Sequence, residues 1–240
     1  MDDRGELHRV DDPETMAREV ADWICRLARS TDQVFAVCLA GGTTPRRVYE
    51  CLAEPAISTR FPWRRVHWFW GDERFVPRHH PDSNFRMVKE ALIARAPVPG
   101  ANVHAVPIEG LSPQRAALAY EEILKHHYGA ERLAPERPLF QLTLLGIGPD
   151  GHTASLFPGH AALSEQRRLV TAIVGPMPEP RITLTYPALD SSRDLAFLVT
   201  GESKRDVLAR VLAGDVALPA ARVHPTGRLH WFVDRAAAPG

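Results

Sequence analysis

Residues 139–160 read LFQLTLLGIGPDGHTASLFPGH, and the rest of the chain is organised around this segment. Its first seven residues form an apolar, β-prone run of the kind found in a buried central strand. The run leads directly into a glycine-rich loop that carries Asp150 and His152. Because ligands of open α/β sheets bind at the carboxyl ends of the strands, we expect this loop to belong to a functional site.

Two other apolar runs end in loops of the same kind. Residues 34–39 read VFAVCL and are followed by GGTTP at residues 41–45, before a helical pattern. Residues 66–70 read VHWFW and run into GDER at residues 71–74. Strands that alternate with helices indicate an α/β fold with a largely parallel sheet, so we expect these loops to lie at one edge of it.

The GGTTP loop has the composition of a phosphate site. Its glycines let the backbone approach a ligand, its threonine hydroxyls can donate hydrogen bonds, and the N–H groups at a helix start attract negative charge. The same residues also make a good helix cap without any ligand. From the residues alone, both interpretations stay open.

The remaining chain supplies further strands and helices. We expect strands near residues 169–174, 181–186, 195–199 and 230–234. A helix from Pro113 to about Tyr128 should place Leu118, Ile123 and Leu124 on its apolar face, and another helix should start at Pro13. Two histidine pairs, His79-His80 and His126-His127, are interpreted as a loop surface and a helix end.

Composition excludes several classes of protein. The 240 residues suit a single α/β domain spanning 1–240, and the chain carries 29 basic and 29 acidic side chains. We expect no nucleic-acid partner and no membrane partner. The chain has no net charge that would attract a nucleic acid or an anionic membrane surface, and it has no apolar run long enough to span a bilayer. Three widely spaced cysteines and the absence of a signal peptide predict buried thiols and a cytoplasmic location.

His152 is the candidate base. An imidazole that titrates near ~6.5 suits proton transfer at neutral pH when a carboxylate such as Asp150 fixes its tautomer. A structural role for His152 stays open at this point. Ser155 lacks the elbow motif of a nucleophile, and Pro149 argues against a dinucleotide-binding turn in the Gly146–Gly151 glycine pattern.

Together the motifs resemble the 6-phosphogluconolactonase family, over nearly the whole chain and in the same order. They are LAGGTTP at residues 39–45, GDERFVP at 71–77 with Ser83-Asn84, and GIGPDGHTASLFPG at 146–159. Ala40 stands where a serine is common in that family. The resemblance implies a three-layer α/β/α sandwich with a mostly parallel, Rossmann-like central sheet.

The activity implied by the resemblance is cofactor-free hydrolysis of 6-phospho-D-glucono-1,5-lactone in the oxidative pentose phosphate pathway. The partner would be that small sugar phosphate lactone, and we expect a monomer, or else a homodimer. A glucosamine-6-phosphate deaminase is the nearest alternative, although its pattern has a glutamate where this chain has Phe157 and a tyrosine in place of Arg74. A sugar-phosphate sensor domain is a more distant alternative.

We expect the site residues to divide into two groups. The catalytic group has His152 as the base, Asp150 as its support, Arg74 or backbone N–H groups at the oxyanion, and Asp72 near the sugar hydroxyls. Lys204 stands in the first turn of a helix, where an anionic ligand would favour it, although a solvated lysine is an equally good interpretation. The second group, which we expect to bind the phosphate of the substrate, comprises Gly42, Thr43, Thr44, Arg181 and Lys204.

Overall fold

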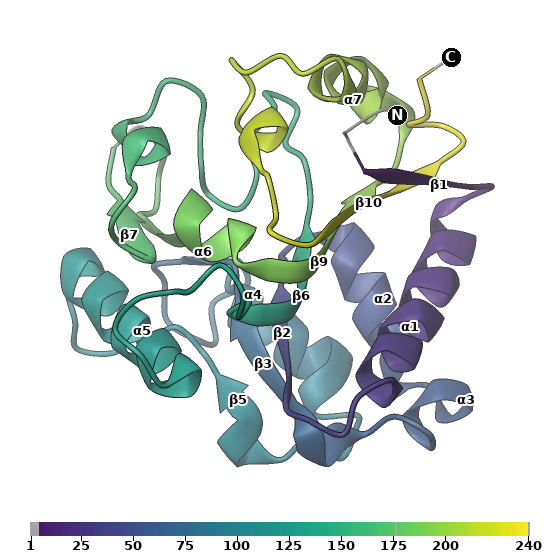
Figure 1. The fold of residues 1–240 in the computed structure, drawn as a ribbon, viewed down its shortest axis with the longest axis horizontal. Coiled ribbons are helices and arrows are strands. Elements are labelled where there is room, and N and C mark those ends of the chain that lie inside the picture. Colours follow the sequence, from purple (N-terminus) through teal and green to yellow (C-terminus); the bar gives the residue numbers. More distant parts are fainter. Residues whose placement is uncertain (1–4, 176, 240) are drawn as a thin grey trace.

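A seven-stranded, wholly parallel sheet runs through the middle of the molecule (Figure 1). The computed structural model describes residues 5–175 and 177–239. In sheet order the strands are β1 (Glu6–Val10), β10 (Arg228–Asp234), β9 (Ser192–Val199), β6 (Phe140–Leu145), β2 (Phe35–Leu39), β3 (Val66–Trp70) and β5 (Val103–His104). The central strands are almost entirely buried, as their apolar sequences predict.

The strand order reverses between β2 and β6. From β2 the chain proceeds outward to β3 and β5, whereas from β6 it proceeds in the opposite direction to β9 and β10. The loops that leave β2 and β6 therefore diverge to opposite faces of the sheet and open a crevice between them. Such a reversal is where open α/β sheets place their ligands.

Helices cover both faces of the sheet, which confirms the predicted three-layer sandwich (Figure 1). One layer contains α1, α2, α3 and α4; the other contains α5, α6 and α7. Their bounds are α1 Pro13–Arg29, α2 Thr43–Ala53, α3 Pro55–Ser58, α4 Asn84–Val88, α5 Pro113–Tyr128, α6 Tyr186–Asp190 and α7 Arg205–Leu212. Asp12 caps α1 through the N–H of Thr15 and Ser112 caps α5, so both predicted starts are confirmed.

Short turns complete the helical segments. A π-helical turn at Lys89–Ile93 continues α4. In the described part of the chain, 3-10 turns lie at Trp63–Arg65, Gly100–Asn102, Ala161–Ser164, Glu202–Lys204 and Pro219–Arg222. Lys204 thus stands directly before α7, one residue earlier than the predicted first turn.

A second, antiparallel sheet was not predicted. It contains β4 (Asp72–Arg74), β8 (Arg181–Leu184) and β7 (Val170–Ile173), in that order. The segment GDER, which the sequence suggested as a loop, is therefore partly a strand. Its three residues form a strand only because β8, far along the chain, pairs with them, and no local pattern carries that information.

Two other expectations were wrong in detail. The strand β1 was missed because ELHRV lacks a continuous apolar run, and it is stabilised by parallel pairing with β10. Leu118 is 47% exposed, whereas Ala116, Ala117 and Tyr120 are the buried positions of that turn of α5. Small residues face the sheet there, which lets the helix approach closely.

Two buried tyrosines complete the ends of β2 and β3. The hydroxyl of Tyr49 in α2 donates to the carbonyl of Ala40 and accepts from its N–H, both at 2.9 Å. The hydroxyl of Tyr120 in α5 does the same for Trp70, at 3.0 and 2.7 Å. Each strand end is thereby held by a helix from a different layer.

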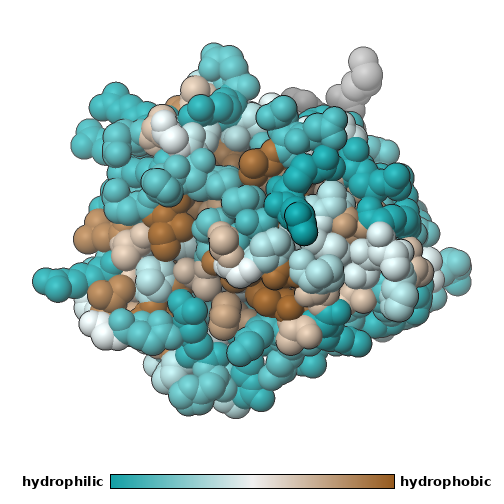
Figure 2. All heavy atoms as spheres, turned by 90° about the horizontal axis from the view of Figure 1, so that it is seen from below, coloured by the Kyte–Doolittle hydropathy of each residue, from teal (hydrophilic) through white to brown (hydrophobic). Residues whose placement is uncertain are grey.

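Within the described ranges, no helix combines the length and the apolar character that a bilayer span requires. Seen from below, apolar side chains form separate patches among hydrophilic ones (Figure 2). The three cysteines are buried free thiols, as predicted.

Candidate active site

A pocket of about 280 Å³ opens at the carboxyl ends of β2, β3 and β6, beside the reversal of strand order. Three of the four predicted catalytic residues line it, namely Asp72, Arg74 and His152, and the fourth, Asp150, is hydrogen-bonded to His152. The lining residues are Leu39, Ala40, Gly41, Gly42, Gly71, Asp72, Arg74, Asn84, Leu145, Gly146, Ile147, Gly148, Pro149, His152, Ala154 and Lys204.

His152 and Asp150 form a close pair. The Nδ1 atom of His152 lies 2.5 Å from Oδ1 of Asp150, and the backbone N–H of His152 donates to the same oxygen at 3.2 Å. Burial opposes ionisation of Asp150, but the hydrogen bonds from His152 outweigh it, so the pKa of Asp150 lies below its usual value. An ionised acceptor requires the proton on Nδ1, which leaves Nε2 as the basic nitrogen of the neutral ring.

Nε2 is free for a substrate or water. Among the residues that the structure describes, none forms a hydrogen bond with this atom. His152 lines the pocket and its side chain is 30% exposed, so solvent reaches it. The pair therefore has the arrangement of a general base with an orienting carboxylate.

The backbone of the same loop is shaped to place His152. A methyl group at Gly148 would lie 2.0 Å from Nδ1 of His152, so only glycine fits beneath the ring. The Gly148 N–H donates to the His152 carbonyl at 2.8 Å and closes the loop. Ala154, also on the pocket wall, has a φ of 48°, a region that costs a residue with a Cβ about 1 kcal/mol or more.

Phe157 packs against the other side of His152. Their ring centroids are 4.8 Å apart with an interplanar angle of 46°. The position that carries a glutamate in the deaminase pattern is therefore an apolar wall beside the imidazole. Phe157 cannot exchange a proton with His152 or with a ligand.

Asp72 joins two of the pocket loops. Its Oδ2 accepts from the hydroxyl of Ser155 at 2.7 Å, and Asn84 donates to its backbone carbonyl at 2.9 Å and to Oδ1 at 3.3 Å. Ser155 is 2% exposed and committed to this bond, in agreement with the prediction that it is no nucleophile. Asp72 lines the pocket, where it can also accept from a ligand hydroxyl.

Glu73 is a residue whose role the sequence analysis missed. It is 2% exposed, and its carboxylate accepts from the backbone N–H groups of Arg74, Asn84 and Phe85 at 2.7–2.8 Å and from the Ser83 hydroxyl at 3.2 Å. Burial raises the pKa of Glu73 to about 7, against the effect of these donors. Side chains alternate between the two faces of a strand, so Glu73 points inward while its neighbours Asp72 and Arg74 face the pocket. This alternation was the signal in the sequence that could have revealed the buried position of Glu73.

Two cations reach the pocket from different loops. Arg74 is held by a 2.7 Å hydrogen bond from Nη1 to the carbonyl of Asp82. Lys204 forms no ion pair among the described side chains; burial lowers its pKa, and the nearby Asp150 opposes that shift. Gly42, the N-cap of α2 with a φ of 103°, brings the helix start to the same wall.

The predicted phosphate residues are placed in three different environments. Gly42 and Lys204 line the pocket, whereas Thr43 lines a neighbouring pocket. The two pockets share Gly42, Arg74 and Asn84, and Arg46 lines the second one. Arg46, in the first turns of α2, was not among the predicted residues. Its position after the GGTTP loop was the available signal.

Thr44 and Arg181 lie outside both lining sets. The Thr44 hydroxyl is 2.7 Å from that of Thr200 and links α2 to the end of β9. Arg181 pairs with Arg74 across β4 and β8, its side chain is 11% exposed, and burial followed by the charge of Arg74 lowers its pKa. The structure therefore does not bring these two side chains to the pocket as the phosphate prediction required.

Comparisons with known proteins agree with this fold and pocket. The sequence model described as glucosamine-6-phosphate isomerases/6-phosphogluconolactonase matches residues 11–231, and the chain belongs to this family. It is 41% identical over 207 residues to a 6-phosphogluconolactonase of Nostoc sp., which covers 85% of this chain and 83% of that protein.

Solved structures show the same relationship. The crystal structure of the Thermotoga maritima 6-phosphogluconolactonase aligns with a TM-score of 0.79 and 34% identity, over 96% of this chain and 99% of that one. A monomeric glucosamine-6-phosphate deaminase aligns with a TM-score of 0.80 over 97% and 98%, at 17% identity. The deaminase thus shares the fold, while the sequence lies nearer to the lactonases.

Proposed function

We propose that this enzyme hydrolyses 6-phospho-D-glucono-1,5-lactone to 6-phospho-D-gluconate. The observation that carries the proposal is the His152–Asp150 pair on the wall of a pocket that also presents Arg74 and Lys204. A base beside two cations suits an acyl centre carried by an anionic molecule. The family and the names of its lactonase relatives support the same reaction, a step of the oxidative pentose phosphate pathway.

In the proposed mechanism, Nε2 of His152 takes a proton from water as the water oxygen attacks the lactone carbonyl. Asp150 stabilises the imidazolium that forms, because its carboxylate accepts the Nδ1 proton at 2.5 Å. The tetrahedral intermediate then collapses, the bond to the ring oxygen breaks, and His152 returns the proton to that oxygen. No net proton remains on the enzyme.

Arg74 is our candidate for the oxyanion, since it lines the pocket and its guanidinium is already oriented by the Asp82 carbonyl. Asp72 is our candidate for binding a sugar hydroxyl. Lys204, Gly42 and Thr43 would hold the phosphate, with the N–H groups at the start of α2 contributing. Arg46 extends this cationic wall, and Thr44 supports it through Thr200.

Deamination of glucosamine 6-phosphate is the second candidate because it shares the fold. The environment of His152 argues against it, since Phe157 packs on the imidazole where the deaminase pattern has a glutamate. A side chain without a titratable proton cannot assist opening of the sugar ring. The chain should therefore act on the lactone and not on the amino sugar.

A direct assay separates the two candidates. Freshly prepared 6-phosphogluconolactone should be hydrolysed well above its spontaneous rate, while glucosamine 6-phosphate should release no ammonia. Ammonia release without lactone hydrolysis would overturn the proposal.

The phosphate assignment is tested by a pair of variants. Lys204→Ala should lower kcat/KM about 10-fold or more for the phosphorylated lactone, the scale of a lost charge-assisted hydrogen bond, and little for unphosphorylated gluconolactone. Lys89→Ala, the matched control, should show no such selectivity because this exposed lysine lies outside both lining sets. Equal losses of Lys204→Ala on both substrates would remove Lys204 from the phosphate site.

A further inference from the structure

Three histidines meet on the face of the sheet that α5 covers. His67 is the second residue of β3, His104 ends the edge strand β5, and His127 lies in the last turn of α5. One ring nitrogen of each lies within 4.8 Å of a ring nitrogen of both others. None of the three lines the pocket, which opens at the other end of β3.

The distances are close to those that a metal ion requires. The Nδ1 atom of His67 and the Nε2 atom of His104 are 2.9 Å apart. Two imidazole nitrogens bound tetrahedrally to Zn²⁺ at about 2.0–2.1 Å lie about 3.3 Å from each other. This pair needs to separate by only a few tenths of an ångström, whereas the His127 nitrogen, which lies within 4.8 Å of the other two, must approach them when the ion binds.

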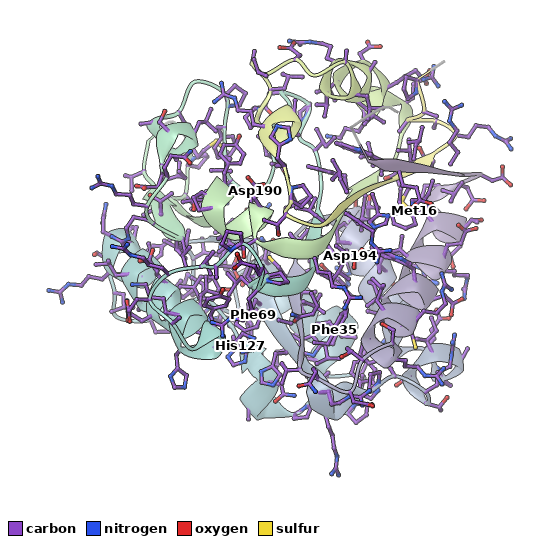
Figure 3. The ribbon with its side chains drawn as sticks, viewed as in Figure 1. Met16, Phe35, Phe69, His127, Asp190 and Asp194 are labelled. Carbon is purple, nitrogen blue, oxygen red and sulfur yellow. The ribbon has the colours of Figure 1, made fainter. Side chains whose placement is uncertain are left out.

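The surroundings favour neutral imidazoles. Phe69 stacks on His104 at 4.4 Å and lies 4.7 Å from His127, and Figure 3 shows Phe69 and His127 side by side. Burial, followed by the neighbouring histidines, lowers the pKa of His104 and of His127 to about 4. At neutral pH the rings therefore carry lone pairs that are available to a cation.

We propose that His67, His104 and His127 form a binding site for a divalent transition-metal ion such as Zn²⁺, with water as the fourth ligand. Imidazole nitrogens suit Zn²⁺, and all three rings are partly exposed, which leaves a side open to solvent. The proton that His67 and His104 share moves to an outer ring nitrogen when the metal binds. No proton is released overall.

The metal ion would anchor the shortest strand of the large sheet. β5 has two residues and pairs with β3 at Val103 and His104. A metal ion would join this strand to α5 and β3 independently of the ladder. Among the described residues no acceptor orients the outer ring nitrogens, so we expect the ion to exchange with solvent and not to be permanently held.

Cobalt binding to the full-length protein tests the proposal. After treatment with a chelator, the protein should bind one equivalent of Co²⁺ with the strong visible absorption of a tetrahedral ion. His104→Gln and His127→Gln should each weaken binding about 10-fold or more. Three control variants should bind Co²⁺ as the unaltered protein does: His126→Gln, His8→Gln and His152→Gln. His126 is adjacent to the cluster but not part of it, and His8 belongs to a second group of side chains that could hold a metal ion.

Two measurements on the unaltered protein keep the test independent of how the variants fold. X-ray absorption of the Zn²⁺-loaded protein should count three imidazole ligands. Zn²⁺ at about 100 times its Kd should raise Tm by roughly 5 °C or more. Absence of Co²⁺ binding, an unchanged Tm, or loss of binding in His8→Gln or His152→Gln instead of His104→Gln would overturn the proposal.

Discussion

The two loops that meet across the pocket are built on opposite plans. The loop after β6 presents the side chains of His152 and Asp150 partly exposed to solvent, and hydrogen bonds of its own backbone together with Phe157 hold the imidazole in place. The segment from β4 to α4 instead surrounds the buried Glu73 with four hydrogen-bond donors. Reactivity thus resides in the loop whose functional side chains are exposed, and shape in the segment built around a buried carboxylate, so mutations in the two should affect different measurements.

The largest effect is expected for His152→Ala. Removing a general base should lower kcat about 10²–10⁴-fold, measured above the spontaneous hydrolysis of the lactone. Because the side chain is partly exposed, the free energy of unfolding should change little. Unchanged turnover would remove His152 from the catalytic role and break the contrast between the loops.

Glu73 should be visible in the pH dependence of stability. Its folded pKa of about 7 lies above the ordinary value of 4.5, so the folded state binds more protons between these values. The contribution is fully present below pH 4.5 and is lost as pH rises toward 7, by about 3 kcal/mol at most. Urea unfolding of the unaltered protein at several pH values measures this slope.

Glu73→Gln provides the matched comparison, because the amide has the same size and does not titrate. Its stability should fall less steeply with pH than that of the unaltered protein, while its side-chain NH₂ group, facing backbone donors, costs stability at low pH. Identical slopes for the two proteins would mean that Glu73 is ionised in both states across this range.

Gly148→Ala tests how finely the β6 loop positions its base. The added methyl group would lie 2.0 Å from Nδ1 of His152 and should displace the ring, at a cost of about 10²-fold in kcat if the shift approaches 1 Å. In Gly146→Ala the methyl group meets no atom within 4 Å, so most activity should remain. If both variants were equally active, the loop would tolerate displacement of the imidazole.

Asp150→Asn should have the smallest effect. The amide oxygen can still accept the Nδ1 proton, but the charge that stabilises the imidazolium is lost, so kcat should fall about 10-fold, below the full contribution of the base. A kcat equal to that of the unaltered enzyme would show that Asp150 only shapes the loop.

The sequence predicted the parts that depend on local pattern. The apolar runs at β2, β3 and β6 and the loops after them were correctly located, and these loops line the pocket. The start of α5 at Pro113 and its cap Ser112 were also predicted, since capping is a property of adjacent residues.

Features that depend on distant pairing could not be predicted. β4 becomes a strand through β8, and Glu73 becomes buried because the start of α4 folds over it. Arg181 has the charge of a phosphate ligand, and the same pairing places it directly opposite Arg74, on the same face of the small sheet but outside the pocket lining. Its part in phosphate binding therefore stays a prediction.

The tyrosine hydroxyls at the ends of β2 and β3 have a consequence for how the enzyme tolerates change. Tyr49 and Tyr120 carry the positions of α2 and α5 directly to the backbone at Ala40 and Trp70, beside the pocket floor. A small shift in either helix, caused by a substitution far from the substrate, is transmitted to that floor. Selection on turnover would then constrain the packing of both outer layers, and engineering of helix surfaces is safest on the sides that face away from these tyrosines.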